Sequence, residues 1–425
     1  MESNKKITLA HGAGGRQTSD LIGSIFKKYF DNPYFTADDA AILDFDTGAA
    51  GESEADEENQ AGAGAEKSEN GAGTGAGKSE NGAGTGAEKS ENGAGAGAGK
   101  SENGVGAGAG KRENGAGTLE EKRECAAAGS KNSSAAGKLA MSTDGFIVSP
   151  WEFPGGNIGK LSICGTVNDL ACMGAKPLYL TCSFVIEEGF LVEDLEKIAA
   201  SMAETAKKAG VKIVAGDTKV AGKGQADQVF ITTTGIGQLQ EGVRLSGAFA
   251  EPGDVILVTG DIGRHGCTVL LEREQLGIEA DIKSDCAPLW GTVESMLAVT
   301  KNIHVIRDAT RGGVGTVLYE IAGESAVGIR LDEQAVPVDP AVRGVCGMLG
   351  LNPLYLANEG TMVVVAPKEE AEVLLSVLRK GEYSENAAII GEITADHTGQ
   401  VVMTTEIGAQ TLLPQPGGEL LPRIC

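Results

Sequence analysis

The sequence lacks the features of three common classes of protein. Its eight cysteines include no CxxC pair and show no zinc-like spacing with the four histidines, so a zinc finger is not indicated. No apolar run has the length that a transmembrane helix needs. Acidic residues outnumber basic ones, and the formal net charge of −23 argues against binding to nucleic acid or to an anionic membrane.

The first residues also lack the pattern of a secretory signal. Met1–Lys6 leads directly into the strand-like run Ile7–Leu9 without an apolar signal core. In a chain of 425 residues, such cysteines are typical of free thiols in a reducing compartment. We therefore expect a cytoplasmic protein, and the hydrophobic content of 41% is sufficient for two folded domains.

Residues 48–137 are nearly all glycine, alanine, serine, glutamate, asparagine and lysine. A unit of the form KSENGAGxGAx recurs with a constant step of eleven residues, starting at Lys67, Lys78, Lys89, Lys100 and Lys111. A segment this poor in large apolar side chains cannot offset the entropy lost on ordering, so we expect a disordered insert. It separates two strand-like runs, residues 40–45 and 138–143. Because loop closure costs little, its removal should leave the fold intact.

Two copies of the repeat resemble a phosphate-binding P-loop, at Gly77–Ser79 and Gly99–Ser101. A working P-loop needs a buried strand before it and a helix after it, so that backbone N–H groups converge on the phosphates. The insert offers neither element. We therefore assign no nucleotide site to it.

Glycine-rich turns open helix-like runs at two places in the remaining chain. His11–Arg16, which contains Gly14 and Gly15, precedes the amphipathic residues 18–30, and a similar turn lies in Arg307–Val314. Such a turn presents backbone N–H groups and a favourable helix dipole to an anion. These turns are common, and His11 can equally be a structural histidine, so the sequence leaves phosphate binding and a purely structural turn both open.

Acidic residues stand at the ends of apolar runs at four places, Asp39, Asp144, Asp169 and Asp217. Single aspartates in such positions are usually turn residues or helix caps. If the four converge, they form an oxygen-rich site for Mg²⁺ that bridges the phosphates of a nucleotide. Glu359 is a turn residue by default, and a general base only if it is buried beside a substrate.

Other segments indicate the framework of the fold. Helix-like runs cover residues 161–174 and 194–210, and apolar strand-like runs cover residues 255–260 and 361–366. The second helical run has an apolar face and a glycine stop at Gly210. A turn at Glu251–Asp254 marks the expected start of a second domain.

The chain ends in Cys425, and a thiol on the last residue is chemically unusual. Cysteine is the best nucleophile among the side chains, with the thiolate as its reacting form. Pro414–Gly418 disfavours helix and supplies a hinge, so an extended arm from Gly417 can carry the thiol roughly 30 Å. An ordinary frayed terminus that happens to end in cysteine is the alternative.

Taken together, the motifs HGAGGR, DDAA, STD, FPGGNIGKL, NDL, GDTK, RDATRGG, ANEG and PRIC closely resemble the HypE family of carbamoyl dehydratases. This family acts in [NiFe]-hydrogenase maturation and lies within the ATP-binding superfamily of aminoimidazole ribonucleotide synthetase. The resemblance covers residues 1–45 and 138–425. PRIC and FPGGNIGKL distinguish it from other members of the superfamily.

The resemblance implies a particular fold. Residues 1–250 would form an α+β N-terminal ATP-binding domain whose strands build a barrel across a homodimer, with residues 48–137 as its insert. Residues 251–410 would form an α/β C-terminal domain, and residues 411–425 a mobile tail. ATP would lie in the cleft with Mg²⁺.

The resemblance also implies roles for individual residues. Asp39, Asp144, Asp169 and Asp217 would be carboxylates on the metal or phosphate side. The nucleotide would be bound by Gly14, Gly15, Thr143, Lys160, Asn168, Thr310 and Arg311. A carbamoyl group on Cys425 would be phosphorylated by ATP and would lose phosphate to give a thiocyanate, with Lys219 neutralising charge and Glu359 taking protons from nitrogen.

Partners follow from the same resemblance. A HypF-like protein would supply the carbamoyl group, and a HypC–HypD-like pair would accept cyanide at iron. Another superfamily enzyme, such as a selenophosphate synthetase or a thiamine-phosphate kinase, is an alternative. Selenophosphate synthetases carry a reactive residue near the N-terminus, however, and no cysteine precedes Cys125 here. A non-enzymatic carrier with the tail as metal ligand is the other alternative, and it leaves the aspartate and glycine motifs unexplained.

Overall fold

The computed structural model describes residues 6–8, 21–30, 138–274 and 276–415. Several predictions concern residues outside these ranges, namely the repeat insert, Gly14, Gly15, Asp39 and Cys425. Within the described ranges, none of the helices combines the length and the apolar character needed to cross a membrane.

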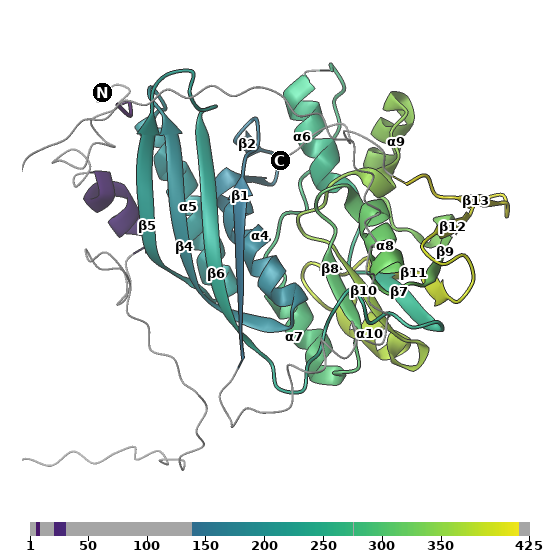
Figure 1. The fold of residues 1–425 in the computed structure, drawn as a ribbon. Coiled ribbons are helices and arrows are strands. Elements are labelled where there is room, and N and C mark those ends of the chain that lie inside the picture. Colours follow the sequence, from purple (N-terminus) through teal and green to yellow (C-terminus); the bar gives the residue numbers. More distant parts are fainter. Residues whose placement is uncertain (1–5, 9–20, 31–137, 275, 416–425) are drawn as a thin grey trace, which may run out of the picture. The chain divides into compact units, whose positions relative to one another are not determined.

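The first sheet has four strands (Figure 1). Their order is β1 (Leu139–Phe146), β6 (Val229–Leu239), β4 (Ala175–Glu187) and β5 (Lys212–Ala221). β6 runs antiparallel to both of its neighbours, whereas β4 and β5 are parallel. Buried and less buried residues alternate along β6, which is the pattern of a sheet with one covered face.

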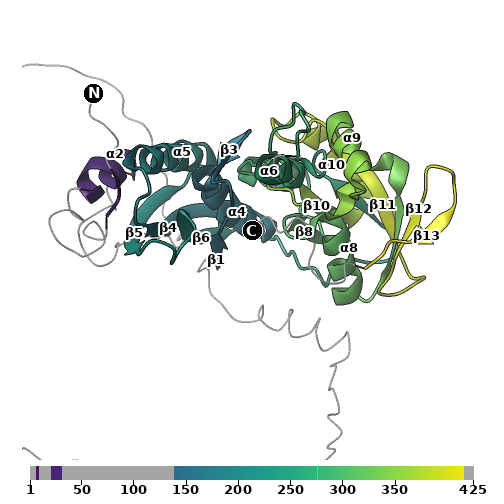
Figure 2. The same ribbon diagram turned by 90° about the horizontal axis from the view of Figure 1, so that it is seen from above.

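Two helices cover that face, α4 (Ile158–Cys172) and α5 (Val192–Ala209), and both lie on one side of the strands in Figure 2. α4 begins earlier than the sequence pattern predicts because the side chain of Asn157 caps it, accepting from the Lys160 N–H at 3.0 Å. α5 ends at Gly210, which adopts the left-handed conformation with φ of 72°. The predicted glycine stop is therefore confirmed.

Nearly every residue of α4 is buried, although the helix has no pronounced apolar face. The reason is that α4 contacts strands β1, β4 and β6 on one side, and α5, α7 (Trp290–Val299) and β8 (Val305–Asp308) on others. Gly159 permits the close approach to α5, since a Cβ there would lie 2.5 Å from the carbonyl oxygen of Ile198. One helix thus packs against strands of both of the larger described sheets.

The second sheet has seven strands. Their order is β13 (Gln410–Leu412), β12 (Val401–Thr404), β9 (Gly328–Asp332), β11 (Ala388–Thr394), β7 (Asp254–Val258), β10 (Met362–Pro367) and β8. All described pairs are antiparallel except β9 with β12. β7 and β10 are buried almost throughout, as their continuous apolar runs predict.

The remaining elements are helices and short segments. The helices are α6 (Arg264–Glu274), α8 (Gly313–Glu324), α9 (Pro340–Leu349) and α10 (Ala371–Leu378). The short segments are η2 (Ile22–Phe26), α2 (Lys27–Phe30), β2 (Glu152–Phe153), β3 (Gly156–Asn157), η3 (Glu333–Ala335), η4 (Pro353–Tyr355) and η5 (Lys368–Glu370). The described part of the predicted helix at residues 18–30 is thus a π-helical turn continued by an α-helical one.

Candidate active site

The register of the first sheet places Asp144 on the face that α4 covers. Asp144 of β1 pairs with Thr233 of β6. The Thr233 hydroxyl donates to the carbonyl oxygen of Ser162 in α4 at 2.9 Å and also hydrogen-bonds the Thr166 hydroxyl at 2.6 Å. Because paired residues on adjacent strands point to the same face, the Asp144 side chain points to the α4 side as well.

Asp169 of α4 joins this group. The Ser142 hydroxyl on β1 donates a hydrogen bond to its carboxylate. Burial raises the pKa of Asp169, and the Asp144 charge adds to that rise, whereas Ser142 and the Arg311 charge oppose it. Three residues that the sequence assigned to the phosphate side, Asp144, Asp169 and Arg311, therefore lie near one another.

Asp308, at the end of β8, is a member of the group that the sequence analysis missed. Burial raises its pKa to about 7, with the charges of Asp169 and Asp144 adding to the effect. The signal was present, because Asp308 ends an apolar strand as the four selected aspartates do. It was read instead as part of the glycine-rich turn that follows.

Glu359, the predicted general base, lies just before β10 and is only 5% exposed. Burial raises its pKa well above the ordinary value, and the charges of Cys286, Asp308 and Asp285 act in the same direction. The sequence analysis made the role of Glu359 conditional on burial, and burial is what the structure has. A buried carboxyl group with a raised pKa holds its proton more tightly than an exposed one, which is the property expected of a group that accepts a proton during a reaction.

Asn168, which was predicted to bind the nucleotide, makes hydrogen bonds to backbone groups. Its side-chain amide donates to the Ala287 carbonyl at 3.0 Å and to the Glu359 carbonyl at 3.4 Å. Its oxygen accepts from the Leu289 N–H at 2.8 Å, and the residue is 2% exposed. In the structure, Asn168 connects α4 to the segments before α7 and before β10.

Lys160 stands in the first turn of α4, where its ammonium donates to the Gly155 carbonyl at 2.9 Å. A hydrogen bond with the Cys164 thiol and burial raise the pKa of the buried Cys286 thiol, and the positive charge of Lys160 opposes that rise. Cys286 in turn is close enough to Glu359 for its charge to raise the pKa of that carboxyl group. A positive charge is therefore present in the neighbourhood of the predicted base.

Thr310 and Arg311 belong to the turn that opens α8. The Thr310 carbonyl accepts from the Gly313 N–H at 3.1 Å, and Gly312 and Gly313 both have positive φ. A Cβ at Gly313 would lie 2.5 Å from the carbonyl oxygen of Leu356, so only glycine fits there. The predicted glycine-rich entry to a helix is confirmed, and it directly follows Asp308.

The other predicted residues lie on the opposite face of the first sheet. Asp217 pairs with Ser183, and Ser183 with Thr232, one position out of step with the row that holds Asp144. The Lys219 ammonium donates to the Asp217 carboxylate at 2.9 Å, which lowers the pKa of Asp217, and both side chains are more than half exposed. Thr143 also points to this side.

Asp144 and Asp217 are consequently well separated within one chain. They lie on β1 and β5, the first and last of the described strands in this sheet, and three strand spacings amount to about 14 Å. Among the residues that the structure describes, no hydrogen bond or ion pair joins Asp217 or Lys219 to Asp144, Asp169 or Glu359. Of the three predicted carboxylates that the structure describes, Asp144 and Asp169 lie near one another, and Asp217 lies apart from them.

The described acidic side chains do not by themselves form a metal site. In the described ranges, no three or more histidine, cysteine, aspartate or glutamate side chains stand close enough together to hold one. Asp144, Asp169 and Asp308 are near enough for their charges to interact. On their own, however, they do not complete a binding site for Mg²⁺.

The sequence matches known families in both domains. Residues 126–239 match the description "AIR synthase related protein, N-terminal domain", and residues 251–404 match "AIR synthase related protein, C-terminal domain". The carbamoyl dehydratase HypE of Azotobacter vinelandii is 50% identical over 289 residues, which are 68% of this chain and 85% of the relative. The HypE of Escherichia coli K12 is 46% identical over 288 residues, again 68% of this chain and 85% of the relative.

Solved structures agree with this relationship. A crystal structure of HypE in complex with ATP has a TM-score of 0.75 and 38% identity, and the match covers 98% of this chain and 99% of that one. The crystal structure of a HypE–HypF complex contains a chain that matches with a TM-score of 0.64 and 47% identity, covering 71% of this chain and 100% of that one.

Proposed function

Because the chain belongs to the carbamoyl dehydratase HypE family, we propose that it dehydrates a carbamoyl group on Cys425 to a thiocyanate at the expense of ATP. The observation that carries this proposal is the position of Glu359. Its carboxyl group is buried, has a raised pKa, and lies next to Asp308, which in turn precedes a glycine-rich helix entry. A base and an anion-binding turn are thereby combined in one site.

The proposed reaction proceeds in two steps. The amide oxygen of the thiocarboxamide attacks the γ-phosphorus of ATP, ADP leaves, and one N–H proton is lost. The C–O bond then breaks with phosphate as the leaving group. The second N–H proton is removed at the same time, and the carbon–nitrogen bond becomes the triple bond of S–C≡N. The sum is loss of one water from the carbamoyl group, with ATP converted to ADP and phosphate.

The described residues have distinct parts in this scheme. Glu359 takes the protons from nitrogen, since its raised pKa makes the carboxylate more basic than an exposed one. Arg311 and the N–H groups at the start of α8 face the phosphates, where negative charge has to be balanced. The burial of Glu359 keeps water from the reacting nitrogen.

Mg²⁺ enters the proposal only as the ion that accompanies ATP. Asp144, Asp169 and Asp308 would face it, and phosphate oxygens would supply further ligands that the described side chains lack.

A homodimer would explain where Lys219 acts. The face of the first sheet that carries Lys219 and Asp217 also exposes the apolar side chains of Leu139, Met141 and Ile147 on and beside β1. Exposed apolar side chains on a sheet face that no described helix covers suit contact with a second copy of the chain. The two sheets would then close into a barrel across the dimer. Lys219 of the partner subunit would then serve the Glu359 site.

The external partners are proposed on the same basis. A HypF-like protein would load the carbamoyl group, in keeping with the HypE–HypF complex among the similar structures. A HypC–HypD-like pair carrying iron would accept the cyanide. Because loading supplies the substrate of the dehydration, the carbamoyl donor has to be present in an assay of water loss, whereas the cyanide acceptor can be omitted.

The test is intact-protein mass spectrometry. The full chain is incubated with a HypF-like carbamoyl donor, carbamoyl phosphate and Mg-ATP, next to the Cys425→Ala variant. We expect an adduct of carbamoyl mass on the tail peptide of the unsubstituted chain, which then loses one water when ATP is present. Absence of any adduct on Cys425 with a demonstrably active donor would contradict the proposal and favour a non-enzymatic carrier.

A further inference from the structure

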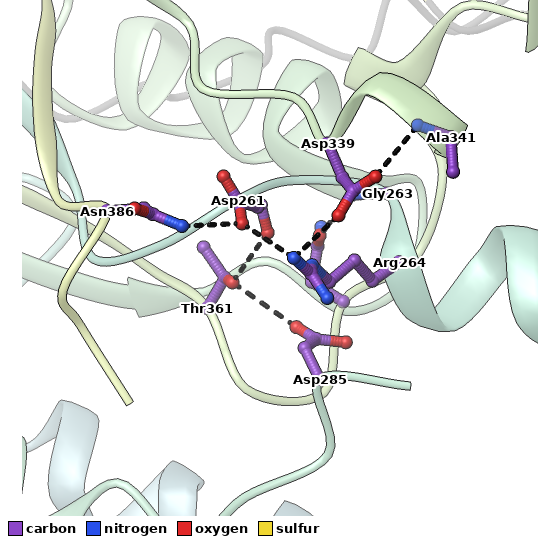
Figure 3. A network of polar contacts seen from close by, with 9 residues as sticks. Asp261, Gly263, Arg264, Asp285, Asp339, Ala341, Thr361 and Asn386 are labelled. Carbon is purple, nitrogen blue, oxygen red and sulfur yellow. Dashed lines mark hydrogen bonds and ion pairs between the residues drawn. The ribbon is translucent and has the colours of Figure 1, made fainter. Parts of the chain in front are cut away.

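A half-buried carboxylate outside the predicted site holds the backbone at Glu359. Asp285, between α6 and α7, accepts from the Glu359 N–H at 3.2 Å and from the Gly360 N–H at 2.9 Å. It also accepts from the Thr361 hydroxyl at 3.2 Å, a contact visible in Figure 3. Three consecutive residues are thus bound by one side chain.

The carbonyl of Glu359 is held from the other direction. It accepts from the Ala287 N–H at 3.2 Å and from the side-chain amide of Asn168 at 3.4 Å. Both backbone polar groups of Glu359 therefore have partners in or beside the segment that follows Asp285. These contacts hold the backbone from which the Glu359 side chain projects.

The two segments pack without space between them. A Cβ at Gly360 would lie 1.8 Å from the Asp285 carbonyl oxygen, so glycine is required at that position. A slide or rotation of the Glu359 backbone would break hydrogen bonds to buried groups, and buried polar groups without partners are costly.

Thr361 extends the contact further within the second domain. Its hydroxyl also lies 3.2 Å from the Asp261 carbonyl oxygen, and the Asp261 carboxylate accepts from Arg264 at 3.0 Å and from Asn386 at 2.8 Å. Arg264 in turn donates to Asp339 at 2.8 Å (Figure 3). The hydrogen bonds around Asp285 are thereby tied to α6 and to the residue that caps α9.

We infer that Asp285 is a positioning residue for Glu359. The Asp285 carboxylate holds the base in place by accepting hydrogen bonds from the backbone N–H groups of Glu359 and Gly360. The inference rests on the proposed function, in which Glu359 takes protons from the carbamoyl nitrogen. Displacement of a catalytic group by about 1 Å can cost about 100-fold in rate. A partly desolvated carboxylate is unfavourable unless it is well hydrogen-bonded, and Asp285 has three donors in one loop, the N–H groups of Glu359 and Gly360 and the Thr361 hydroxyl.

The experiment uses the full chain with its carbamoyl donor and measures three quantities for each variant. These are the fraction of Cys425 carbamoylated, the dissociation constant for ATP, and the single-turnover rate of water loss by mass spectrometry. The variants are Asp285→Asn, which keeps one acceptor oxygen, and Asp285→Ala, which keeps none. Asp254→Asn is the matched control. Asp254 is buried and accepts a hydrogen bond from a backbone N–H. In the sheet it is paired with Pro367, at the end of β10 away from Glu359.

We expect loading and ATP affinity within about twofold of the unsubstituted chain for all folded variants. The rate of water loss should fall by about tenfold or more in Asp285→Ala, by less in Asp285→Asn, and should not change in Asp254→Asn. A general structural defect would lower ATP affinity and loading in proportion, and that result would overturn the inference. So would an unchanged rate in both Asp285 variants. If Asp285→Ala does not fold, the Asp285→Asn rate alone decides. Failure of the unsubstituted chain to lose water would count against the proposed function instead.

Discussion

Burial and the neighbouring charge of Asp169 together raise the pKa of Asp308 to about 7. In an unfolded chain the same carboxyl group has its ordinary pKa of 3.8. Between these two values the folded protein keeps a proton that the unfolded chain releases. Asp308 therefore contributes a stability that decreases as the pH rises through this window, which is the opposite of what a salt-bridged aspartate does.

Asp308→Asn should remove this dependence. Without nucleotide, we expect the variant to exceed the unsubstituted chain in free energy of unfolding by up to about 4 kcal/mol near pH 8, because one pKa unit corresponds to about 1.4 kcal/mol. The difference should disappear below about pH 4. Urea denaturation at several pH values measures it. The control is Asp227→Asn, because Asp227 is exposed. If Asp308→Asn changes the free energy of unfolding by the same amount at all pH values, the explanation is refuted.

Glu359→Gln should separate binding from chemistry. The amide retains the shape of the side chain but cannot take a proton, so the rate of water loss from carbamoylated Cys425 should fall by about 100-fold or more. Loading and ATP affinity should stay within about twofold. Single-turnover mass spectrometry and equilibrium nucleotide binding provide the readouts. Unimpaired water loss in this variant would remove Glu359 from the mechanism.

Mixed dimers can test whether Lys219 acts across subunits. Lys219→Ala and Glu359→Gln chains should each be inactive alone, but mixing them by dissociation and reassociation should restore about a quarter of the sites, since half the dimers then hold one intact site. A mixture of Asp169→Asn with Glu359→Gln is the control, because those residues share one site within a chain. Equal recovery in both mixtures, or none in the first, would speak against a site shared between subunits.

The close contact between α4 and α5 predicts a sharp difference between two helical glycines. Gly159→Ala should destabilise the fold by about 2 kcal/mol, since its methyl group meets the Ile198 carbonyl at 2.5 Å. Gly344→Ala, in the exposed part of α9 with no atom nearby, should stabilise it by up to about 1 kcal/mol. Thermal unfolding of the two variants measures both effects. Equal shifts in the same direction would show that helix propensity, not packing, dominates at Gly159.

Where a local pattern determines the structure, the sequence was a sufficient guide. Gly210 ends α5 because glycine alone adopts the left-handed conformation without penalty, and the two-domain α and β architecture was confirmed by the family matches. The burial on which the predicted role of Glu359 depends is present in the structure, and the role itself stays a prediction.

What the sequence could not supply was the set of long-range contacts. Asn168 bonds backbone groups of Ala287, Leu289 and Glu359, more than a hundred residues away, and no spacing rule connects them. Asp285 was missed for the same reason. The separation of Asp144 from Asp217 depends on strand order and on the alternation of faces, and the order of strands in a sheet is not written in any one strand.

The position of α4 has a consequence for unfolding. A helix buried between two sheets loses partners on both sides if either sheet melts, so neither half of the protein can open fully while the other stays native. We therefore expect one cooperative transition for the described chain, and the slowest amide hydrogen exchange in Leu161–Leu170. Two calorimetric peaks would show that the halves melt independently despite their shared helix.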